Sequence, residues 1–129
     1  MKNFSAEQAL FESADYAGRV AASAARPTPM IVGTPTTLFG NTVDWKQPVS
    51  YVAGGVCGFA WVSIRPARGR FVAYLKSRKI GGVDHYAGGY SVSSRLMVQS
   101  MALNEAYAEA FAGVLRAANI EASAHSRID

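Results

Sequence analysis

Cysteine and histidine are scarce in this sequence, and their scarcity narrows the chemistry open to it. Cys57 is the only cysteine, so the chain cannot form an internal disulfide, which suits a reducing cytoplasm. The two histidines, His85 and His125, lie far from Cys57 and from each other along the sequence. Structural zinc sites use closely spaced ligand pairs instead. We therefore predict no metal site and no cofactor.

Long apolar runs are also missing. The chain reaches Glu7 and Glu12 before an apolar run of the length found in a secretory signal can build. Residues 51–64 form the longest weakly polar stretch, and they are too few to cross a hydrocarbon core of about 30 Å. We expect no signal peptide, no transmembrane helix and no membrane partner.

Acidic residues are absent between Asp44 and Asp84, where seven basic residues lie. The rest of the chain holds six basic and nine acidic residues, a balance of −3 against +4 for the whole protein. A local excess of positive charge attracts polyanions. Six of the seven are close together in the sequence and are predicted to bind an anion: Arg65, Arg68, Arg70, Lys76, Arg78 and Lys79.

Half of the residues are hydrophobic and 17% are charged, which is typical of a globular protein. A chain of this length fits a single domain. We divide residues 1–129 into an N-terminal helix and arm, residues 1–48, and an α+β core, residues 49–129.

The N-terminal part is rich in alanine and then in proline and threonine. Ser5 and Gln8 have the spacing of a capping box, and alanines recur at helical intervals after them, which predicts a helix over residues 5–25. Its alanine face permits close approach of a neighbour, so we expect a contact with a second subunit and a homo-oligomer. Residues 26–50 predict an irregular arm with one edge strand at residues 30–32.

The core alternates strand and helix patterns. Residues 49–53 and 56–64 predict a hairpin, or one strand with a glycine bulge, and the second part is apolar on both faces, as in a central strand. Pro66 suits the first turn of a helix, and Gly81 and Gly82 are expected to end that helix. A strand over residues 90–94, a helix between Ser100 and Asn119, and a strand over residues 120–124 follow.

This order predicts an α+β fold, a two-layer sandwich with right-handed crossovers and helices on one sheet face. The most specific expectation is a ferredoxin-like arrangement, preceded by the extra N-terminal helix and the Pro/Thr-rich arm.

The central strand also carries an aromatic motif. Five of the eight positions of residues 57–64 fit the octamer of RNA-recognition motifs, which these residues resemble. In that family such rings stack on single-stranded bases, and Phe59 and Trp61 point to the same face of a strand. Cys57 replaces the usual basic residue, Ile64 replaces the last aromatic one, and the chain opens with a helix instead of a strand. A buried central strand explains the same residues, and we favour that interpretation.

The basic segment has two interpretations as well. Arg65, Arg68 and Arg70 surround the predicted start of a helix, where free amide groups favour anions. The alternative is a solvated basic face, or one paired with acids such as Glu105 and Glu109. No loop has the composition of a nucleoside-triphosphate cradle, so we do not predict a kinase or ATPase.

A glycine-rich turn holds the remaining candidates. His85, Tyr86 and Tyr90 form a predicted ligand loop that could close over a small molecule, and a plain polar turn is the alternative. Nothing fixes a distance between Cys57 and His85, and we favour a core cysteine over a nucleophile. No acid–base pair is set apart by spacing, so we predict no catalytic residue and regard an enzyme as the weakest hypothesis.

Several short motifs lie between residues 56 and 129: Cys57-Gly58-Phe59-Ala60-Trp61-Val62, Gly88-Gly89-Tyr90, Gln99-Ser100, Glu105-Ala106-Tyr107-Ala108 and Ser126-Arg127-Ile128-Asp129. With these motifs the chain resembles small uncharacterised proteins encoded in tailed-bacteriophage genomes. The resemblance implies a phage product acting in the host cytoplasm or within the virion, and it carries no catalytic signature.

Two hypotheses follow. The first is a non-enzymatic phage accessory protein that binds nucleic acid, or a nucleotide-like anion, through its basic helix and nearby aromatic residues. The second is a virion or assembly protein whose residues 1–48 make subunit contacts while its basic surface faces an acidic protein surface.

Overall fold

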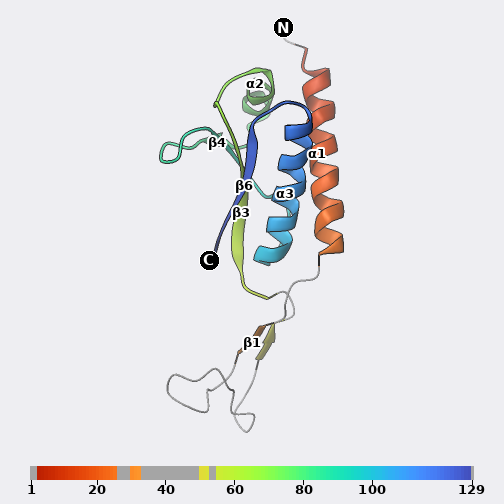
Figure 1. Ribbon diagram of the computed structural model, residues 1–129, viewed down its shortest axis with the longest axis vertical. Helices are drawn as coiled ribbons and strands as arrows, with labels where there is room; N and C mark the ends of the chain where they lie inside the picture. The colour runs from red at the N-terminus through yellow and green to blue at the C-terminus, as the bar shows by residue number, and fades with distance from the viewer. Residues whose placement is uncertain (1–2, 26–29, 33–49, 53–54, 129) are drawn as a thin grey trace.

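The computed structural model of this chain describes residues 3–25, 30–32, 50–52 and 55–128. Within these ranges the fold is α+β, with three helices, a four-stranded antiparallel sheet and a separate two-stranded one. Figure 1 shows α3 along one face of the larger sheet, with α1 beside α3 on the side away from the sheet. The elements are α1 (Ser5–Ala24), β1 (Met30–Val32), β2 (Ser50–Val52), β3 (Gly58–Ile64), α2 (Arg70–Ser77), β4 (Gly82–Val83), β5 (Tyr90–Ser93), α3 (Met101–Ala117) and β6 (Ala122–Ile128).

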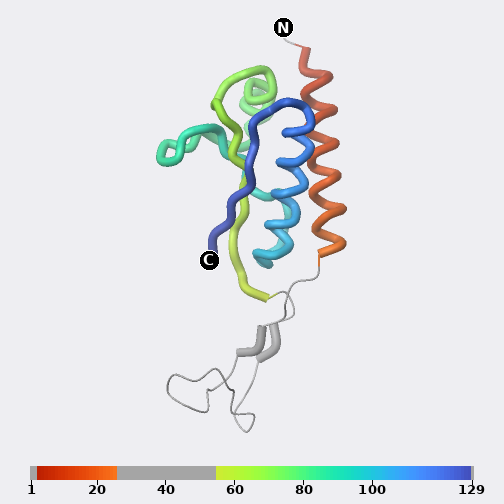
Figure 2. Tube along the Cα trace, viewed as in Figure 1, coloured from red at the N-terminus to blue at the C-terminus, as the bar shows by residue number. Residues whose placement is uncertain are grey.

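The larger sheet has the strand order β4-β5-β3-β6, and each neighbouring pair is antiparallel. β3 is therefore central, which confirms the prediction made from its two apolar faces. β6 pairs with β3 over its whole length, from Ala122 opposite Ile64 to Ile128 opposite Gly58. Figure 2 shows this C-terminal segment in blue beside β3 in yellow-green. The last strand is longer than the predicted residues 120–124.

The predicted pairing of residues 49–53 with the central strand is wrong. β2 pairs instead with β1, with Tyr51 opposite Ile31. The edge strand predicted at residues 30–32 is confirmed. The remainder of the Pro/Thr-rich arm lies outside the described residues.

α1 confirms the predicted helix, but the capping box is wrong. The side-chain oxygen of Asn3 accepts a hydrogen bond from the backbone N–H of Ser5 at 2.9 Å. A residue two positions upstream of the helix therefore supplies the acceptor for its first backbone N–H. Gln8 does not reach back and donates to Glu12 at 3.2 Å. The start is set by a local polar contact that the capping-box spacing did not include.

The small-residue face of α1 packs against α3 of the same chain. Ala14, Gly18 and Ala22 are its buried positions. A Cβ atom added at Gly18 would lie 2.5 Å from the ring of Tyr107, closer than real Cβ contacts come. Glycine is therefore required here for the two helices to approach. The face that we expected to contact a second subunit is covered within the protomer.

The core lies between the helices and one face of the sheet. Each large apolar side chain buried there contributes about 1.5–3 kcal/mol relative to an exposed one. The largest fully buried side chains are Tyr107, Phe111, Ile64, Leu75, Leu115, Val62, Val72 and Val92. They come from α2, α3, β3 and β5, so these four elements share one core.

The helix ends were predicted with mixed success. Pro66 does not begin α2, which starts at Arg70. Lys79, with a φ of +58°, ends the helix in place of Gly81, and the N–H of Ile80 bonds the carbonyl of Leu75 at 2.9 Å. The predicted limits of α3 are confirmed, because the hydroxyl of Ser100 accepts the Leu103 N–H and Asn119 has a φ of +67°. Among the described helices, none combines the length and the apolar character needed to cross a bilayer.

Candidate nucleic-acid interface

The two aromatic residues of β3 lie on the side of the sheet away from the core. Successive strand residues point to opposite faces, and Ala60, Val62 and Ile64 are buried against the helices. Phe59 is 50% exposed, and Trp61 is partly exposed. The favoured interpretation, in which both rings lie in the core, is wrong. Small and aliphatic residues at the even positions fill the core, which leaves the rings for the other face.

The neighbouring strands extend this surface, which we call the open face. On β6, Arg127 lies opposite Phe59 and His125 lies opposite Trp61, and on β5, Ser93 also lies opposite Trp61. Within the described residues, no helix packs on this side. The open face consists of Phe59 and Trp61 from β3, Ser91 and Ser93 from β5, and Ser123, His125 and Arg127 from β6, whereas Ser63, the next β3 residue on this side, is buried.

Two cross-strand pairs dominate the open face. The guanidinium carbon of Arg127 lies 5.7 Å from the centre of the Phe59 ring, a cation–π contact. The rings of Trp61 and His125 stack, with centroids 5.8 Å apart and planes inclined by 24°. The hydroxyl of Ser123 lies 3.0 Å from Nε2 of His125. The surface thus combines flat rings with a cation, the combination that binds stacked bases and their phosphates.

Arg65 follows Ser63 by two positions and anchors the turn between β4 and β5. Its guanidinium donates to the carbonyl of Ala87 at 2.6 Å. Asp84 closes the same turn, because its side chain accepts the N–H groups of Ala87 and Tyr86 at 3.0 and 2.9 Å. These two bonds lower the pKa of the Asp84 carboxyl. Figure 2 shows this turn in teal, projecting on the side of the sheet opposite α1 and α3.

The predicted ligand loop is only partly assembled. His85 and Tyr86 are exposed in the turn, and the Tyr86 side chain is fully accessible. Tyr90 is buried in the core, where its hydroxyl donates to the carbonyl of Ile80 at 2.5 Å and burial raises its pKa. The assignment of Tyr90 to a ligand loop is therefore wrong, because β5 points its side chain toward the helices.

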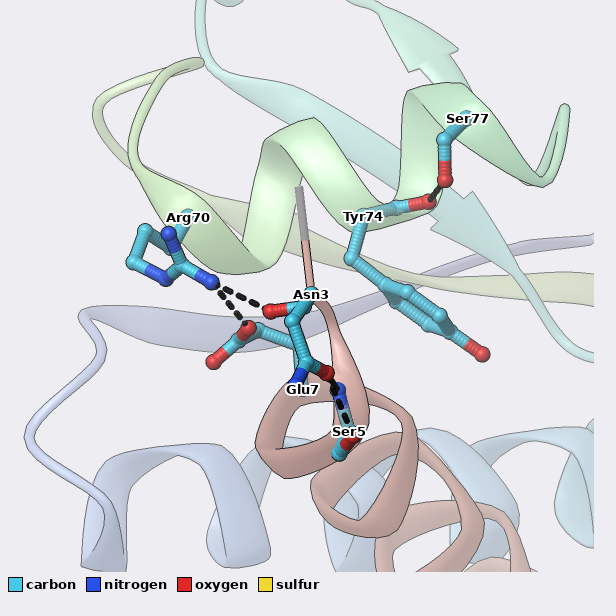
Figure 3. Close-up of polar contacts among 6 residues, drawn as sticks. All are labelled: Asn3, Ser5, Glu7, Arg70, Tyr74 and Ser77. Atoms are coloured by element: carbon cyan, nitrogen blue, oxygen red, sulfur yellow. Dashed lines mark hydrogen bonds and ion pairs between the residues drawn. The ribbon is translucent and has the colours of Figure 1, made fainter. Parts of the chain in front are cut away.

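The basic segment does not form one patch. Arg70 joins α2 to the N-terminus of α1: it pairs with Glu7 at 3.0 Å and donates to the carbonyl of Asn3 at 2.7 Å, as Figure 3 shows. Its guanidinium also lies 5.6 Å from the ring centre of Phe4. Arg70 is thus a structural clamp, and the acid that pairs with it is Glu7 instead of the expected Glu105 or Glu109.

The other cations near α2 are exposed. Arg68, Lys76, Arg78 and Lys79 make no ion pair with any residue that the structure describes. They lie on or beside α2, whose buried side chains pack into the core with the other helices. Of the six basic residues that were predicted to bind an anion, Arg65 is the one that continues the row of open-face residues along β3.

A cavity of about 400 Å³ lies at the start of α2. Arg65, Arg68 and Arg70 line it, as predicted for an anion site, but Glu7 and Glu121 line it too. The two carboxylates offset much of the positive charge, so this cavity is less suited to an anion than its arginines alone suggest.

Cys57 and His85 lie at opposite ends of β3. Cys57 precedes the strand and is partly buried, with its sulfur 3.9 Å from the side-chain oxygen of Gln99. His85 lies in the turn beyond the other end, where Ile64 pairs with Tyr90. A seven-residue strand separates them by roughly 20 Å. The two side chains cannot act as nucleophile and base.

Sequence reasoning missed His125 and Arg127 as site residues. The last strand was expected to end at residue 124, so neither side chain was placed beside the aromatic residues of β3. Their alternation with Ala122 and Ala124 is the period of a strand with one covered and one uncovered face, and that pattern could have revealed them.

No protein-family model matches this chain, and neither a curated protein nor a solved structure matches it.

Proposed function

We propose that this protein binds single-stranded nucleic acid on its open face. Phe59 and Trp61 stack on successive bases, and Arg127 contacts the phosphate backbone beside them. The observation that carries the proposal is the half-exposed Phe59 ring with the Arg127 guanidinium at 5.7 Å, on a sheet face free of helices within the described residues.

Stacking supplies the first part of the binding free energy. A base stacked on an aromatic side chain contributes about 1–3 kcal/mol and depends little on base identity. Double-stranded nucleic acid keeps its bases paired and stacked on each other, so the rings can engage only an unpaired strand. A single strand is therefore the ligand that uses both rings.

Charge supplies the second part. Arg127 lies on the open face and Arg65 lies at its end, whereas the one acidic group in the adjoining turn, Asp84, is bonded to backbone amides. A cation that contacts a phosphate of a single strand releases a counterion, so binding weakens as salt rises.

We also propose that the core is ferredoxin-like. The support is the strand order β4-β5-β3-β6, with α2 between β3 and β4 and α3 between β5 and β6. Each helix then connects two strands that have a third strand between them, which is the split βαβ connection of that fold. Such a fold leaves one face of its sheet uncovered, as the proposed function requires.

The resemblance of residues 56–129 to tailed-phage proteins supports a biological setting for this activity. In that setting the protein is a non-enzymatic phage accessory protein, acting in the host cytoplasm or within the virion. The virion or assembly hypothesis depended on α1 and the arm, and the small-residue face of α1 is packed on α3. We therefore rank it second.

The alternative binding surface for the same ligand class is α2. Its support is the exposure of Arg68, Lys76, Arg78 and Lys79, which form no ion pair within the described residues. α2 offers charge without exposed rings, so binding there would be purely electrostatic and indifferent to base stacking.

The test is binding of a fluorescently labelled single-stranded oligonucleotide, followed by anisotropy. The double variant Phe59→Ala, Trp61→Ala loses two stacked rings and weakens binding by about 30-fold or more, which corresponds to at least about 1 kcal/mol for each ring. Tyr16→Ala is the matched control, because Tyr16 is 72% exposed on α1 and lies off the open face. Equal affinities for the double variant and the control would refute the proposal.

A further inference from the structure

β6 lies at one edge of the larger sheet, and its outer edge pairs with no other strand that the structure describes. Natural proteins protect such edges with prolines, bulges, inward-pointing charges or very short strands. β4, at the opposite edge, has only two residues. β6 has seven residues without a proline, pairs with β3 at every position without a bulge, and carries one charge, Arg127, near its end. Its outer edge is therefore suited to pair with a further strand.

The hydrogen bonds to β3 determine which backbone groups of β6 face the outer edge. The N–H of Arg65 donates to the carbonyl of Glu121 at 3.0 Å, at the position that continues the β3–β6 register. Hydrogen-bonded and non-hydrogen-bonded pairs alternate along an antiparallel ladder, so odd-numbered residues bond β3 and even-numbered ones face outward. The carbonyl of Ala122 agrees with this, since it accepts the Arg116 guanidinium at 2.9 Å and keeps a second lone pair. The residues of β6 that face outward with both backbone groups are Ala122, Ala124 and Ser126.

The sequence around Ala124 is complementary to itself when read in opposite directions. Glu121 and Arg127 lie three positions to either side of Ala124, and Ile120 and Ile128 lie four positions to either side. Two copies related by a twofold axis at this residue would place Arg127 opposite Glu121 and Ile128 opposite Ile120. Cross-strand pairs of opposite charge and of apolar side chains both stabilise a sheet.

The same side chains lack such partners within one chain. Neither Glu121 nor Arg127 forms an ion pair with a residue that the structure describes. Ile128 is 64% exposed, although it is large and apolar. Pairing with a second copy would give a partner to each of them.

We propose that two copies of this chain pair through the outer edges of β6, in antiparallel orientation and with Ala124 on the twofold axis. This residue faces outward in both copies, so the outward backbone groups meet as an antiparallel ladder requires. The homo-oligomer expected from the sequence then forms through β6 instead of α1. The inference goes beyond nucleic-acid binding and does not depend on it.

The dimer joins the two open faces. Residues directly opposite each other in an antiparallel pair lie on the same side of the sheet, so both open faces lie on one side of a continuous sheet. A guanidinium has five N–H donors, so Arg127 can pair with Glu121 of the second copy and still contact a phosphate.

Sedimentation velocity of the full chain at low salt, over roughly 1–200 μM, measures this association. Strand pairing alone buries a small interface, so we expect a dissociation constant on the order of 10 μM. The mass rises with concentration from 13.7 kDa toward twice that value. Arg127→Glu and Glu121→Arg each place like charges opposite each other in two symmetric pairs, and each weakens association by about fivefold or more. The double variant with both reversals restores opposite charges and returns the affinity to within about twofold of the wild type.

Glu12→Arg is the matched control, because it reverses an exposed charge on α1, away from β6, and it dimerises like the wild type. Circular dichroism verifies that each variant is folded. A wild-type protein that stays monomeric throughout the concentration range contradicts the proposal. A dimer that neither reversal weakens, or that the double variant does not recover, contradicts it as well.

Amide hydrogen exchange separates a second copy from a segment of the same chain as the partner of this edge. The N–H of Ala124 faces outward, so its protection from exchange increases with protein concentration if a second copy covers it. Protection that is the same at all concentrations assigns the edge to the chain itself and overturns the proposal, and so does an unprotected Ala124 N–H at the highest concentration.

Discussion

Substitution of Gly18 by alanine should destabilise the fold, although alanine is the better helix former. In an exposed helix position, glycine to alanine stabilises by about 1 kcal/mol. At Gly18 the new Cβ would lie 2.5–3.0 Å from three carbons of the Tyr107 ring. That ring is 1% exposed and its hydroxyl is bonded to Asp15, so it has little freedom to move. Overpacking of this kind costs about 1–3 kcal/mol, and more when the neighbour is rigid, so we expect a net loss of about 1–2 kcal/mol.

The matched control is Gly113→Ala on α3. A Cβ at Gly113 meets only the guanidinium of Arg116, at 3.8 Å, which is an ordinary contact. The same substitution there should stabilise the protein by about 0.5–1 kcal/mol. Urea unfolding followed by circular dichroism measures both changes, and the two midpoints should move in opposite directions from the wild type. If Gly18→Ala raises the midpoint as Gly113→Ala does, the described packing of α1 on α3 is incorrect.

Two further predictions concern charged groups. Partial burial alone would raise the pKa of Asp15, but the hydrogen bond from Tyr107 and the pairing with Arg19 outweigh it and lower that pKa. A lowered pKa means stability that is present above the unfolded-state value near 4 and is lost as pH falls through the folded-state value. Urea titrations between neutral and acidic pH should show this loss, and Tyr107→Phe should reduce both the stability at neutral pH, by about 1–3 kcal/mol, and its pH dependence. For binding, Arg127→Gln should reduce the slope of log affinity against log salt concentration by about 0.7, whereas Lys76→Gln should leave it unchanged; the reverse result would assign binding to α2.

The central strand was predictable because its signal is local and strong. A run without charged residues from Val56 to Ile64 favours burial on both sides. Which face holds the core was not predictable from that run, since Phe59 and Trp61 are larger and more apolar than Ala60. The even positions Ala60, Val62 and Ile64 are buried because α3 packs on that side of β3, and this is a tertiary effect that no strand pattern contains.

Two of the errors have their physical origin in contacts between residues that are distant in the sequence. β2 pairs with β1, which lies near the start of the Pro/Thr-rich arm, whereas the glycine-rich connection from β2 to β3 resembles a hairpin turn in sequence alone. Arg70 was predicted to bind an external anion because its partner, Glu7, lies on α1 at the other end of a long sequence separation. The helix limits of α3, in contrast, depend on Ser100 and Asn119 themselves, and they were predicted correctly.

The most direct test of the open face is residue-level mapping by nuclear magnetic resonance. A chain of 129 residues is small enough to give resolved backbone amide spectra, into which an unlabelled single-stranded oligonucleotide is titrated. We predict the largest shift changes at Phe59, Trp61, His125 and Arg127, together with the Trp61 indole N–H, while the amides of α2 change little. Changes confined to α2, or none at saturating oligonucleotide, would contradict the account.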